Sequence, residues 1–158
     1  MEPIVFIVES GSTRETKAWG RRLASMLEGG ELLALEGELG VGKTCFIKGV
    51  ARGLNLREEQ VVSPTFTMIQ EHPGRIPLYH IDLYRMEEAV LEDMGLREYL
   101  FSEAVAAVEW FGRLREAEEL ERISIRISYT GASSRRIEFA ALGDRYGGLI
   151  GRLRRRFG

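Results

Sequence analysis

Residues 37–44 read Gly-Glu-Leu-Gly-Val-Gly-Lys-Thr and match the pattern G-x-x-x-x-G-K-[ST]. Glycines let the main chain turn tightly enough to present a concave row of backbone amides, which is the shape that binds phosphate groups. The helix expected after the loop adds the positive end of its dipole. Lys43 supplies a mobile positive charge for the outer phosphates, and the Thr44 hydroxyl is a hard oxygen ligand for magnesium. The stretch therefore predicts a site for ATP or a related nucleotide with Mg²⁺.

The sequence on both sides of this loop supports the same interpretation. Residues 32–35 form a continuous apolar run, as expected of a strand that is buried on both faces in a parallel sheet. Residues 44–54 repeat apolar side chains at helical spacing. A glycine-rich turn unrelated to phosphate would not require a buried strand before it and a helix after it. We therefore expect nucleotide contacts from Glu38, Leu39, Gly40, Val41, Gly42, Lys43, Thr44 and Cys45.

The composition is that of an ordinary globular protein, with 158 residues, 44% of them apolar and 29% charged. This length fits one domain, which we expect to span residues 1–158. The net charge of −2 does not favour a protein that binds polyelectrolytes as a whole. The only cysteine, Cys45, excludes an internal disulfide and suits the reducing cytoplasm. No apolar stretch approaches the roughly 18 residues needed to cross a bilayer, so we expect a cytoplasmic location and no membrane contact.

Helical and strand patterns alternate along much of the chain. Residues 15–27 predict a helix capped by Ser12 or Thr13, and residues 87–100 predict a second helical stretch. A basic helix is expected at the C-terminus. Strands are predicted over residues 3–8, 32–35, 76–81 and 104–108, extended segments at 61–62 and 66–69 around an irregular loop at 63–65, and a hairpin over 123–127 and 137–139. Together these patterns predict a three-layer α/β domain of the P-loop NTPase class, with a mainly parallel central sheet and an antiparallel C-terminal hairpin.

A magnesium ion bound to phosphate also needs a carboxylate, usually at the carboxyl end of a neighbouring buried strand. Two positions qualify. Glu109 follows five consecutive apolar residues, which is the Walker-B arrangement with glutamate in place of aspartate. Asp82 follows the less uniform strand at residues 76–81. Either residue taken singly also fits a capping or solvated carboxylate, and sequence logic alone does not rank the two.

Absent motifs narrow the class of P-loop protein. A GTPase carries Asn-Lys-x-Asp to bind guanine, and this chain has no Asn-Lys pair. A nucleotide kinase normally has an arginine-bearing lid between its later strands, whereas residues 83–103 are short and acidic. Two alternatives to an ATPase remain: a small-molecule kinase, and a nucleotide-gated binding module that does not need hydrolysis.

Five motifs occur in an order that indicates a family. They are Gly-Glu-Leu-Gly-Val-Gly-Lys-Thr (37–44), Ser-Pro-Thr-Phe (63–66), His-Ile-Asp-Leu-Tyr-Arg (80–85), Leu-Glu-Asp-Met-Gly-Leu (91–96) and Val-Glu-Trp (108–110). Together they resemble the TsaE (YjeE) family of bacterial ATPases, which assist the synthesis of threonylcarbamoyladenosine in tRNA. The match runs from about residue 12 to residue 112. The first motif is shared by very many proteins, but the combination is highly specific.

The resemblance implies a role for each matched residue. In the family the Walker threonine and the glutamate of Glu-Trp bind magnesium, which implies Thr44 and Glu109. The aspartate of the third motif matters for hydrolysis, so Asp82 becomes the candidate that orients or activates the attacking water. With Lys43, the residues Asp82 and Glu109 form the catalytic set. The resemblance also implies Trp110 beside the nucleotide and a switch segment near the γ-phosphate made of Ser63, Pro64, Thr65 and Phe66. Cys45 departs from the second threonine that is common in the family, and it lies past the magnesium ligand.

The resemblance implies partners as well. A threonylcarbamoyl-transferase subunit and its companion subunit load threonylcarbamoyl onto N6 of the adenosine that lies 3′ to the anticodon. By the same resemblance, we expect the ATP cycle of this chain to reset that complex between turnovers. The sequence shows no identifiable arginine finger, so we expect the chain to hydrolyse ATP slowly when alone and a partner to complete the site.

Several residues keep two interpretations on chemistry alone. Trp110 and Phe66 are either neighbours of the nucleotide or core aromatics. His80 is either a structural histidine that orients its loop or a proton carrier. Ser12 and Thr13 at the start of the first helix are further predicted nucleotide contacts.

The C-terminal end is basic. It is either a solvated helix whose last-turn cations suit the helix dipole, or a surface for tRNA or an acidic partner. Arg135 or Arg136 could instead reach the nucleotide. The arginines after residue 133 are Arg135, Arg136, Arg145, Arg152, Arg154, Arg155 and Arg156, against the acidic residues Glu138 and Asp144.

Overall fold

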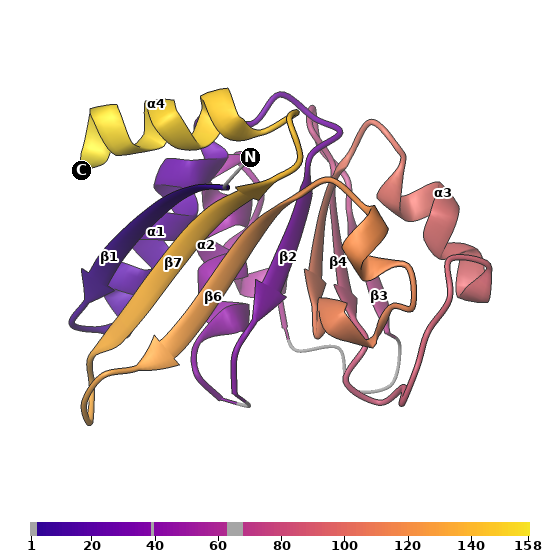
Figure 1. Cartoon of the computed structure of the whole chain (residues 1–158), viewed down its shortest axis with the longest axis horizontal. Coiled ribbons are helices and arrows are strands. Elements are labelled where there is room, and N and C mark those ends of the chain that lie inside the picture. Colours follow the sequence, from indigo (N-terminus) through magenta and orange to yellow (C-terminus); the bar gives the residue numbers. More distant parts are fainter. Residues whose placement is uncertain (1–2, 39, 63–67) are drawn as a thin grey trace.

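One mixed β-sheet forms the centre of the molecule. In the computed structural model, which describes residues 3–38, 40–62 and 68–158, the sheet has the strand order β1-β7-β6-β2-β5-β4-β3 (Figure 1). The strands are β1 (Ile4–Ser10), β2 (Leu32–Glu36), β3 (Ile69–His72), β4 (Leu78–Asp82), β5 (Val105–Glu109), β6 (Arg122–Tyr129) and β7 (Arg135–Leu142). The α-helices are α1 (Thr13–Ala24), α2 (Lys43–Gly53), α3 (Leu96–Leu100) and α4 (Gly147–Phe157), with short 3-10 helices η1 (Glu58–Gln60), η2 (Asp93–Gly95), η3 (Phe111–Arg113) and η4 (Ala117–Glu119).

Strands β4, β5, β2 and β6 run parallel, and β7 and β3 pair antiparallel with the outer two of these four strands. The β6–β7 pair confirms the predicted C-terminal hairpin, and β3 pairs antiparallel with β4 at the other edge. The hairpin is not the edge of the sheet, because β1 pairs along β7 with Val8 opposite Ile137. Because parallel strands end at the same edge, the carboxyl ends of β2, β4 and β5 lie together.

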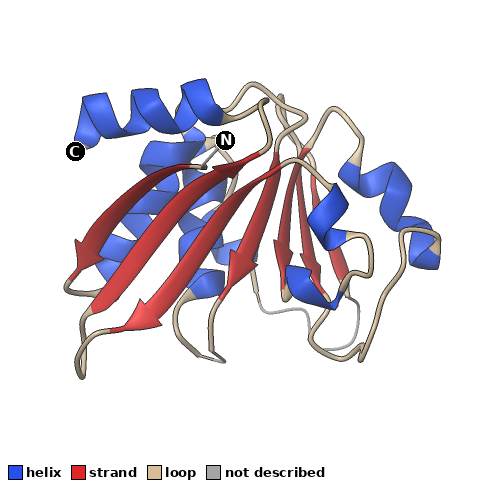
Figure 2. Cartoon of the chain, viewed as in Figure 1, coloured by secondary structure: helices blue, strands red, loops and turns tan. Residues whose placement is uncertain are grey.

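Helices cover both faces of the sheet, as the three-layer prediction requires (Figure 2). On one face α1, α2 and α4 pack on the sheet through side chains such as Trp19, Phe46 and Ile150. The other layer is thinner: α3, η3 and η4 pack over β2, β4 and β5 with Leu96 and Phe111. The two cores meet at β2, which is buried on both sides.

The burial of β2 follows from its sequence. Leu33 and Leu35 point into the core under α1 and α2, while Leu32 and Ala34 point into the core under α3 and η3. Side chains alternate between the two faces of a strand, so a strand covered on both faces needs apolar residues at every position. The apolar run at residues 32–35 therefore predicted this strand correctly.

The predicted helical stretch over residues 87–100 is mostly wrong. Only α3 is helical there, preceded by the short η2. Met94 and Gly95 have φ of 53° and 73°, a left-handed backbone that ends a helix. Upstream, Ala89 is fully buried and its amide donates to Arg113 O at 2.8 Å. Tertiary pairing of this segment with residues 113–115 thus replaces the local helical hydrogen bonds.

Other boundaries shift by only a few residues. The amide of Glu15 donates to Ser12 Oγ at 3.1 Å, which identifies Ser12 as the cap of α1, and the helix ends three residues before the expected Leu27. Strand β4 begins after Pro77, which has no amide to donate. The irregular loop predicted at residues 63–65, and residues 66–67 of the extended segment, lie outside the described part of the chain. None of the described helices is long and apolar enough to cross a membrane.

Candidate functional site

The phosphate loop connects the carboxyl end of β2 to the start of α2 (Figure 1). Gly37, Gly40 and Gly42 have φ of 149°, 79° and 118°, a range that side-chain-bearing residues rarely adopt. A Cβ on Gly37 would lie 2.5 Å from the carbonyl oxygen of Ile127, so only glycine lets the chain leave β2 beside β6. Leu39, a predicted nucleotide contact, lies outside the described residues. The local backbone is therefore the one that a phosphate loop needs.

Lys43 is buried at the start of α2. Its Nζ donates to Gly37 O at 2.6 Å and lies 4.0 Å from the centre of the Trp110 ring. Burial lowers the pKa of this ammonium group, and the nearby charges of Glu109 and Asp82 oppose that shift. The positive charge that the motif requires therefore lies inside the loop, close enough to both candidate carboxylates to feel their charge.

The Thr44 hydroxyl makes contact with one of the two carboxylates. Its Oγ1 donates to Glu109 Oε2 at 3.2 Å. Glu109 ends β5, Asp82 ends β4, and the two are direct partners in the parallel register. The described residues contain no cluster of three or more His, Cys, Asp or Glu side chains that would enclose a metal ion. A hydroxyl and one carboxylate fit Mg²⁺, which usually keeps several waters and binds phosphate oxygens.

Asp82 lies at the carboxyl end of β4 and is half-buried. Burial raises the pKa of its carboxyl group, and the charge of Glu109 adds to the rise. The backbone amide of Tyr84 donates to Oδ1 at 2.9 Å and acts in the opposite direction. A carboxylate with a raised pKa that is fixed by one backbone hydrogen bond is suited to accept a proton from water.

His80 is fully buried in β4 and holds Glu109. Its Nε2 lies 2.6 Å from Glu109 Oε2, the same oxygen that accepts from Thr44. An ionised carboxylate only accepts, so the tautomer with the proton on Nε2 makes this hydrogen bond. Of the two interpretations from the sequence, the geometry favours a histidine that orients the carboxylate.

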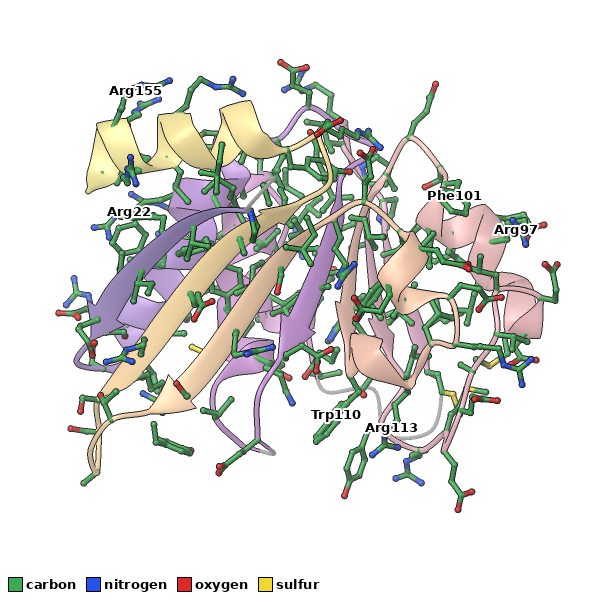
Figure 3. The ribbon with its side chains drawn as sticks, viewed as in Figure 1. Arg22, Arg97, Phe101, Trp110, Arg113 and Arg155 are labelled. Carbon is green, nitrogen blue, oxygen red and sulfur yellow. The ribbon has the colours of Figure 1, made fainter. Side chains whose placement is uncertain are left out.

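Trp110 forms one wall of the site. Lys43 Nζ lies 4.0 Å and the Arg113 guanidinium 5.2 Å from the centre of its ring, and the centre of the Tyr84 ring is 5.1 Å away. Arg113 Nη1 also donates to Tyr84 O at 2.9 Å, which ties the turn after β5 to the loop after β4. Figure 3 shows Trp110 and Arg113 at the end of the molecule where the phosphate loop lies. The predicted switch residues, 63–66, lie outside the described residues.

The start of α1 lies against the helix that follows the loop. Cys45 Sγ donates to Thr13 O at 3.2 Å, so the two predicted contacts are neighbours. The Ser12 side chain accepts from Glu15 N and is used by the helix cap. The structure thus places Thr13 against Cys45, two residues after Lys43, and gives Ser12 a structural task.

Two side chains of the hairpin also contact the loop. Arg135 Nε donates to Val41 O at 2.7 Å, and Tyr129 Oη donates to Gly40 O at 2.8 Å. The sequence predicted Arg135 as a nucleotide contact and not as a contact of the loop. Tyr129 was missed, because it belongs to no motif and only its place at the end of β6 brings it to the loop. Glu38 is exposed, and its carbonyl accepts from Val41 N at 3.2 Å.

A mainly parallel sheet with this loop, a buried lysine and a Thr–Glu contact defines a P-loop nucleotide-binding protein. The family model "Threonylcarbamoyl adenosine biosynthesis protein TsaE" matches residues 10–137. This chain belongs to the TsaE family.

Similarity to individual proteins and to a solved structure also supports membership of the TsaE family. The Bacillus subtilis protein named "tRNA threonylcarbamoyladenosine biosynthesis protein TsaE" is 47% identical over 133 residues, which cover 84% of this chain and 83% of the relative. A protein of the same name from Treponema pallidum is 42% identical over 122 residues, or 75% of this chain and 87% of the relative. The crystal structure of Bacillus subtilis YdiB is similar over 100% of this chain and 99% of that chain, with a TM-score of 0.81 and 36% identity.

Proposed function

We propose that this chain is an ATPase that assists the biosynthesis of threonylcarbamoyladenosine in tRNA. Its place in the TsaE family and the names of its relatives support the pathway. The observation that carries the chemistry is the 3.2 Å contact between Thr44 and Glu109 below a phosphate loop. The reaction converts ATP and water to ADP and phosphate, slowly when the chain is alone.

In this proposal the loop amides and Lys43 bind the β- and γ-phosphates, and Thr44 and Glu109 hold Mg²⁺. When bound, the magnesium ion neutralises charge that develops on the phosphate oxygens. His80 keeps Glu109 Oε2 turned toward Thr44. The remaining proposed nucleotide contacts are Glu38, Gly40, Val41, Gly42, Cys45, Thr13, Trp110 and Arg135.

The chemical step is attack of water on the γ-phosphorus. The water oxygen forms a bond to phosphorus, the bond from phosphorus to the bridging oxygen breaks, and ADP leaves. Asp82 orients the water and accepts its proton, because its carboxylate ends the strand next to Glu109 and has a raised pKa. Lys43 stabilises the charge that builds up on the leaving group.

Two variants separate this proposal from its alternatives. Thr44→Ala should lose Mg²⁺-dependent ATP binding, whereas Asp82→Ala should bind ATP, fail to release phosphate and fail to support tRNA modification. A nucleotide-gated binding module predicts instead that Asp82→Ala supports modification fully without hydrolysis. A small-molecule kinase predicts that labelled phosphate appears on an added acceptor instead of in water.

The proposed partners are the threonylcarbamoyl-transferase subunit and its companion, and the proposed place is the cytoplasm, where they meet tRNA. The ATP cycle resets that complex between turnovers. Purified transferase pair and tRNA should give about one modified tRNA per complex, and adding this chain with ATP should give many. Equal product after long incubation with and without the chain would rule out the resetting role.

A basic surface on three helices suggests a direct tRNA contact. Two hollows of about 780 and 550 Å³ share Ser25 and Arg156, and Glu28 is the acidic residue in their linings. Arg22 lies over the rings of Trp19 and Phe157, which holds its guanidinium in place. Figure 3 shows Arg22 and Arg155 at the α4 side, opposite Trp110. The basic surface consists of Arg21, Arg22, Arg52, Arg152, Arg155 and Arg156.

Arginines clustered in a hollow fit the phosphates of RNA, because each guanidinium binds two phosphate oxygens. The double variant Arg155→Glu/Arg156→Glu should weaken tRNA binding and flatten its salt dependence in fluorescence anisotropy. The matched control is Arg97→Glu/Arg115→Glu, which makes the same charge change on residues paired with Glu92 and Glu88. Equal tRNA affinity of the two double variants would exclude this contact. If Arg155→Glu/Arg156→Glu loses only its binding to the transferase, the basic surface binds an acidic protein partner instead.

A further inference from the structure

We infer that Tyr129 and Arg135 are positioning residues that hold the phosphate loop from outside, through two of its carbonyl oxygens. Tyr129 Oη donates to Gly40 O at 2.8 Å, and Arg135 Nε donates to Val41 O at 2.7 Å. The inference rests on the proposed nucleotide site and assigns Arg135 a task in addition to its proposed nucleotide contact. It also adds Tyr129, which no motif contains.

The two side chains form one unit at the end of the hairpin. Tyr129 and Arg135 are the last cross-strand pair of β6 and β7, and the guanidinium lies 5.5 Å from the centre of the tyrosine ring. A second hydrogen bond, from Arg135 Nη1 to Ser133 O at 3.4 Å, ties the guanidinium to its own turn. Because the cross-strand contact already restricts both side chains, they lose less conformational entropy when they form hydrogen bonds to the loop.

The two hydrogen bonds from Tyr129 and Arg135 fix the direction of backbone amides in the loop. The described peptide bonds are trans, so each carbonyl points away from the amide of the next residue. Holding Val41 O on the hairpin side therefore turns the amide of Gly42 toward the opposite, concave side of the loop. Holding Gly40 O likewise fixes the amide of Val41, which closes the turn by donating to Glu38 O at 3.2 Å.

The loop needs such support because glycines make it flexible. Gly40 and Gly42 have φ of 79° and 118°, and glycine pays the largest entropy cost when it is ordered. A Cβ on Gly40 would meet no atom within 4 Å beyond its chain neighbours among the described residues, so the chain is open on that side. The hairpin hydrogen bonds order the loop before phosphate arrives, which raises nucleotide affinity.

Two variants, each with a matched control, test whether these hydrogen bonds position the loop. Tyr129→Phe removes one hydroxyl, and Arg135→Lys removes the Nε donor while it keeps the charge. ADP affinity, measured by calorimetry without Mg²⁺, should fall about three- to tenfold in each. Tyr146→Phe also loses a hydroxyl that is hydrogen-bonded to a backbone amide, from Leu32, and Arg136→Lys changes the neighbouring arginine, which pairs with Glu9. Both controls should bind ADP as the parent does.

Hydrogen exchange of backbone amides tests whether Tyr129 and Arg135 position the loop, independently of whether the proposed function is correct. In the nucleotide-free protein the amides of Val41 and Gly42 should exchange faster in Tyr129→Phe and Arg135→Lys than in the parent. If in both variants these amides exchange at the parent's rate and ADP affinity stays within twofold of the parent's, Tyr129 and Arg135 do not position the loop. If the parent does not bind ADP, the proposed function fails, and the exchange rates alone decide whether the hairpin orders the loop.

Discussion

Asp82 is a half-buried carboxylate at the end of β4, and its pKa is raised chiefly by burial. A raised pKa in the folded state means that ionisation costs more there than in the unfolded chain, so the charge destabilises the fold at neutral pH. Below the usual pKa of an aspartate, near 4, the group is protonated in both states and the penalty disappears. We therefore expect Asp82→Asn to be more stable than the parent at pH 7 and equal to it near pH 3.5.

Urea unfolding at several pH values measures this difference, in buffer without nucleotide or Mg²⁺. Asparagine keeps an oxygen that accepts the Tyr84 amide, so the comparison isolates the charge. The same variant should not hydrolyse ATP. A lower stability of Asp82→Asn at pH 7 would show that Lys43 and His80 already offset the cost of ionisation, contrary to the direction of the pKa shift.

His80 offers a second prediction at this scale. Replacing its fully buried ring by alanine leaves a cavity and removes the hydrogen-bond donor to Glu109, which should cost about 3 kcal/mol of unfolding free energy. Because Glu109 is then oriented less well, Mg²⁺ affinity in the presence of ADP should fall about tenfold. His80→Gln, whose amide nitrogen can reach Glu109, should recover part of that affinity. If both variants bind Mg²⁺ like the parent, His80 is only a core residue.

Individual site residues were predictable where a motif fixes their place in the chain. Lys43 and Thr44 follow from the loop pattern, and the family resemblance points to Glu109 as the partner of Thr44. The residue types alone left Glu109 and Asp82 equivalent, because strand register decides which carboxylate a hydroxyl can reach. Tyr129 shows the limit most clearly, since its contact with Gly40 joins residues 89 positions apart.

Helices α1 and α2 pack unusually closely, and glycines make this possible. A Cβ on Gly49 would lie 2.0 Å from Lys17 O, and a Cβ on Gly20 would lie 2.2 Å from Phe46 O. Alanine usually stabilises a helix interior by about 1 kcal/mol relative to glycine. At Gly49 the backbone clash should reverse the sign, and we expect Gly49→Ala to lose about 2 kcal/mol or more in urea unfolding, because the helices must separate.

The control for this prediction is Gly151→Ala in α4. There the nearest atom to an added Cβ is Arg155 Nη1 at 3.3 Å, the end of a flexible exposed side chain. That variant should be as stable as the parent or gain up to about 1 kcal/mol. A Gly49→Ala protein as stable as Gly151→Ala would contradict the close helix contact.

Helices and strands were predicted correctly where the apolar pattern agrees with burial in the fold. The prediction failed where long-range backbone pairing replaces local hydrogen bonds. The strands at residues 32–35 and 104–108 and the helix after the phosphate loop have strong apolar patterns, and all three form. Residues 87–100 also carry apolar side chains at mixed spacing, but Ala89 pairs with the segment after η3, and Met94 and Gly95 interrupt the helix. The sequence contains no local signal for that long-range pairing.

At the scale of the whole molecule, two surfaces lie at opposite ends of α1 and α2. The carboxyl ends of β2, β4 and β5 form the proposed nucleotide site beside the first turns of these helices, and α4 with the last turns of α1 and α2 forms the basic surface (Figures 1 and 3). Alternating strands and helices predicted this fold class, because the class depends on the order of elements. The joining of arginines from three helices was not predictable, since only packing places Arg22 and Arg52 beside the C-terminal helix.

This separation predicts that changes at the two surfaces act independently. Arg155→Glu/Arg156→Glu should weaken tRNA binding and leave ATP hydrolysis unchanged, whereas Asp82→Asn should abolish hydrolysis and leave tRNA affinity unchanged. Sites without shared contacts are usually additive to within about 0.5 kcal/mol. The tRNA affinities of the parent, the two single-site variants and the combined variant form a thermodynamic cycle, which is measured once with and once without ADP. A coupling free energy above about 1 kcal/mol would show that the nucleotide state reaches the basic surface, and the two surfaces would then form one allosteric unit.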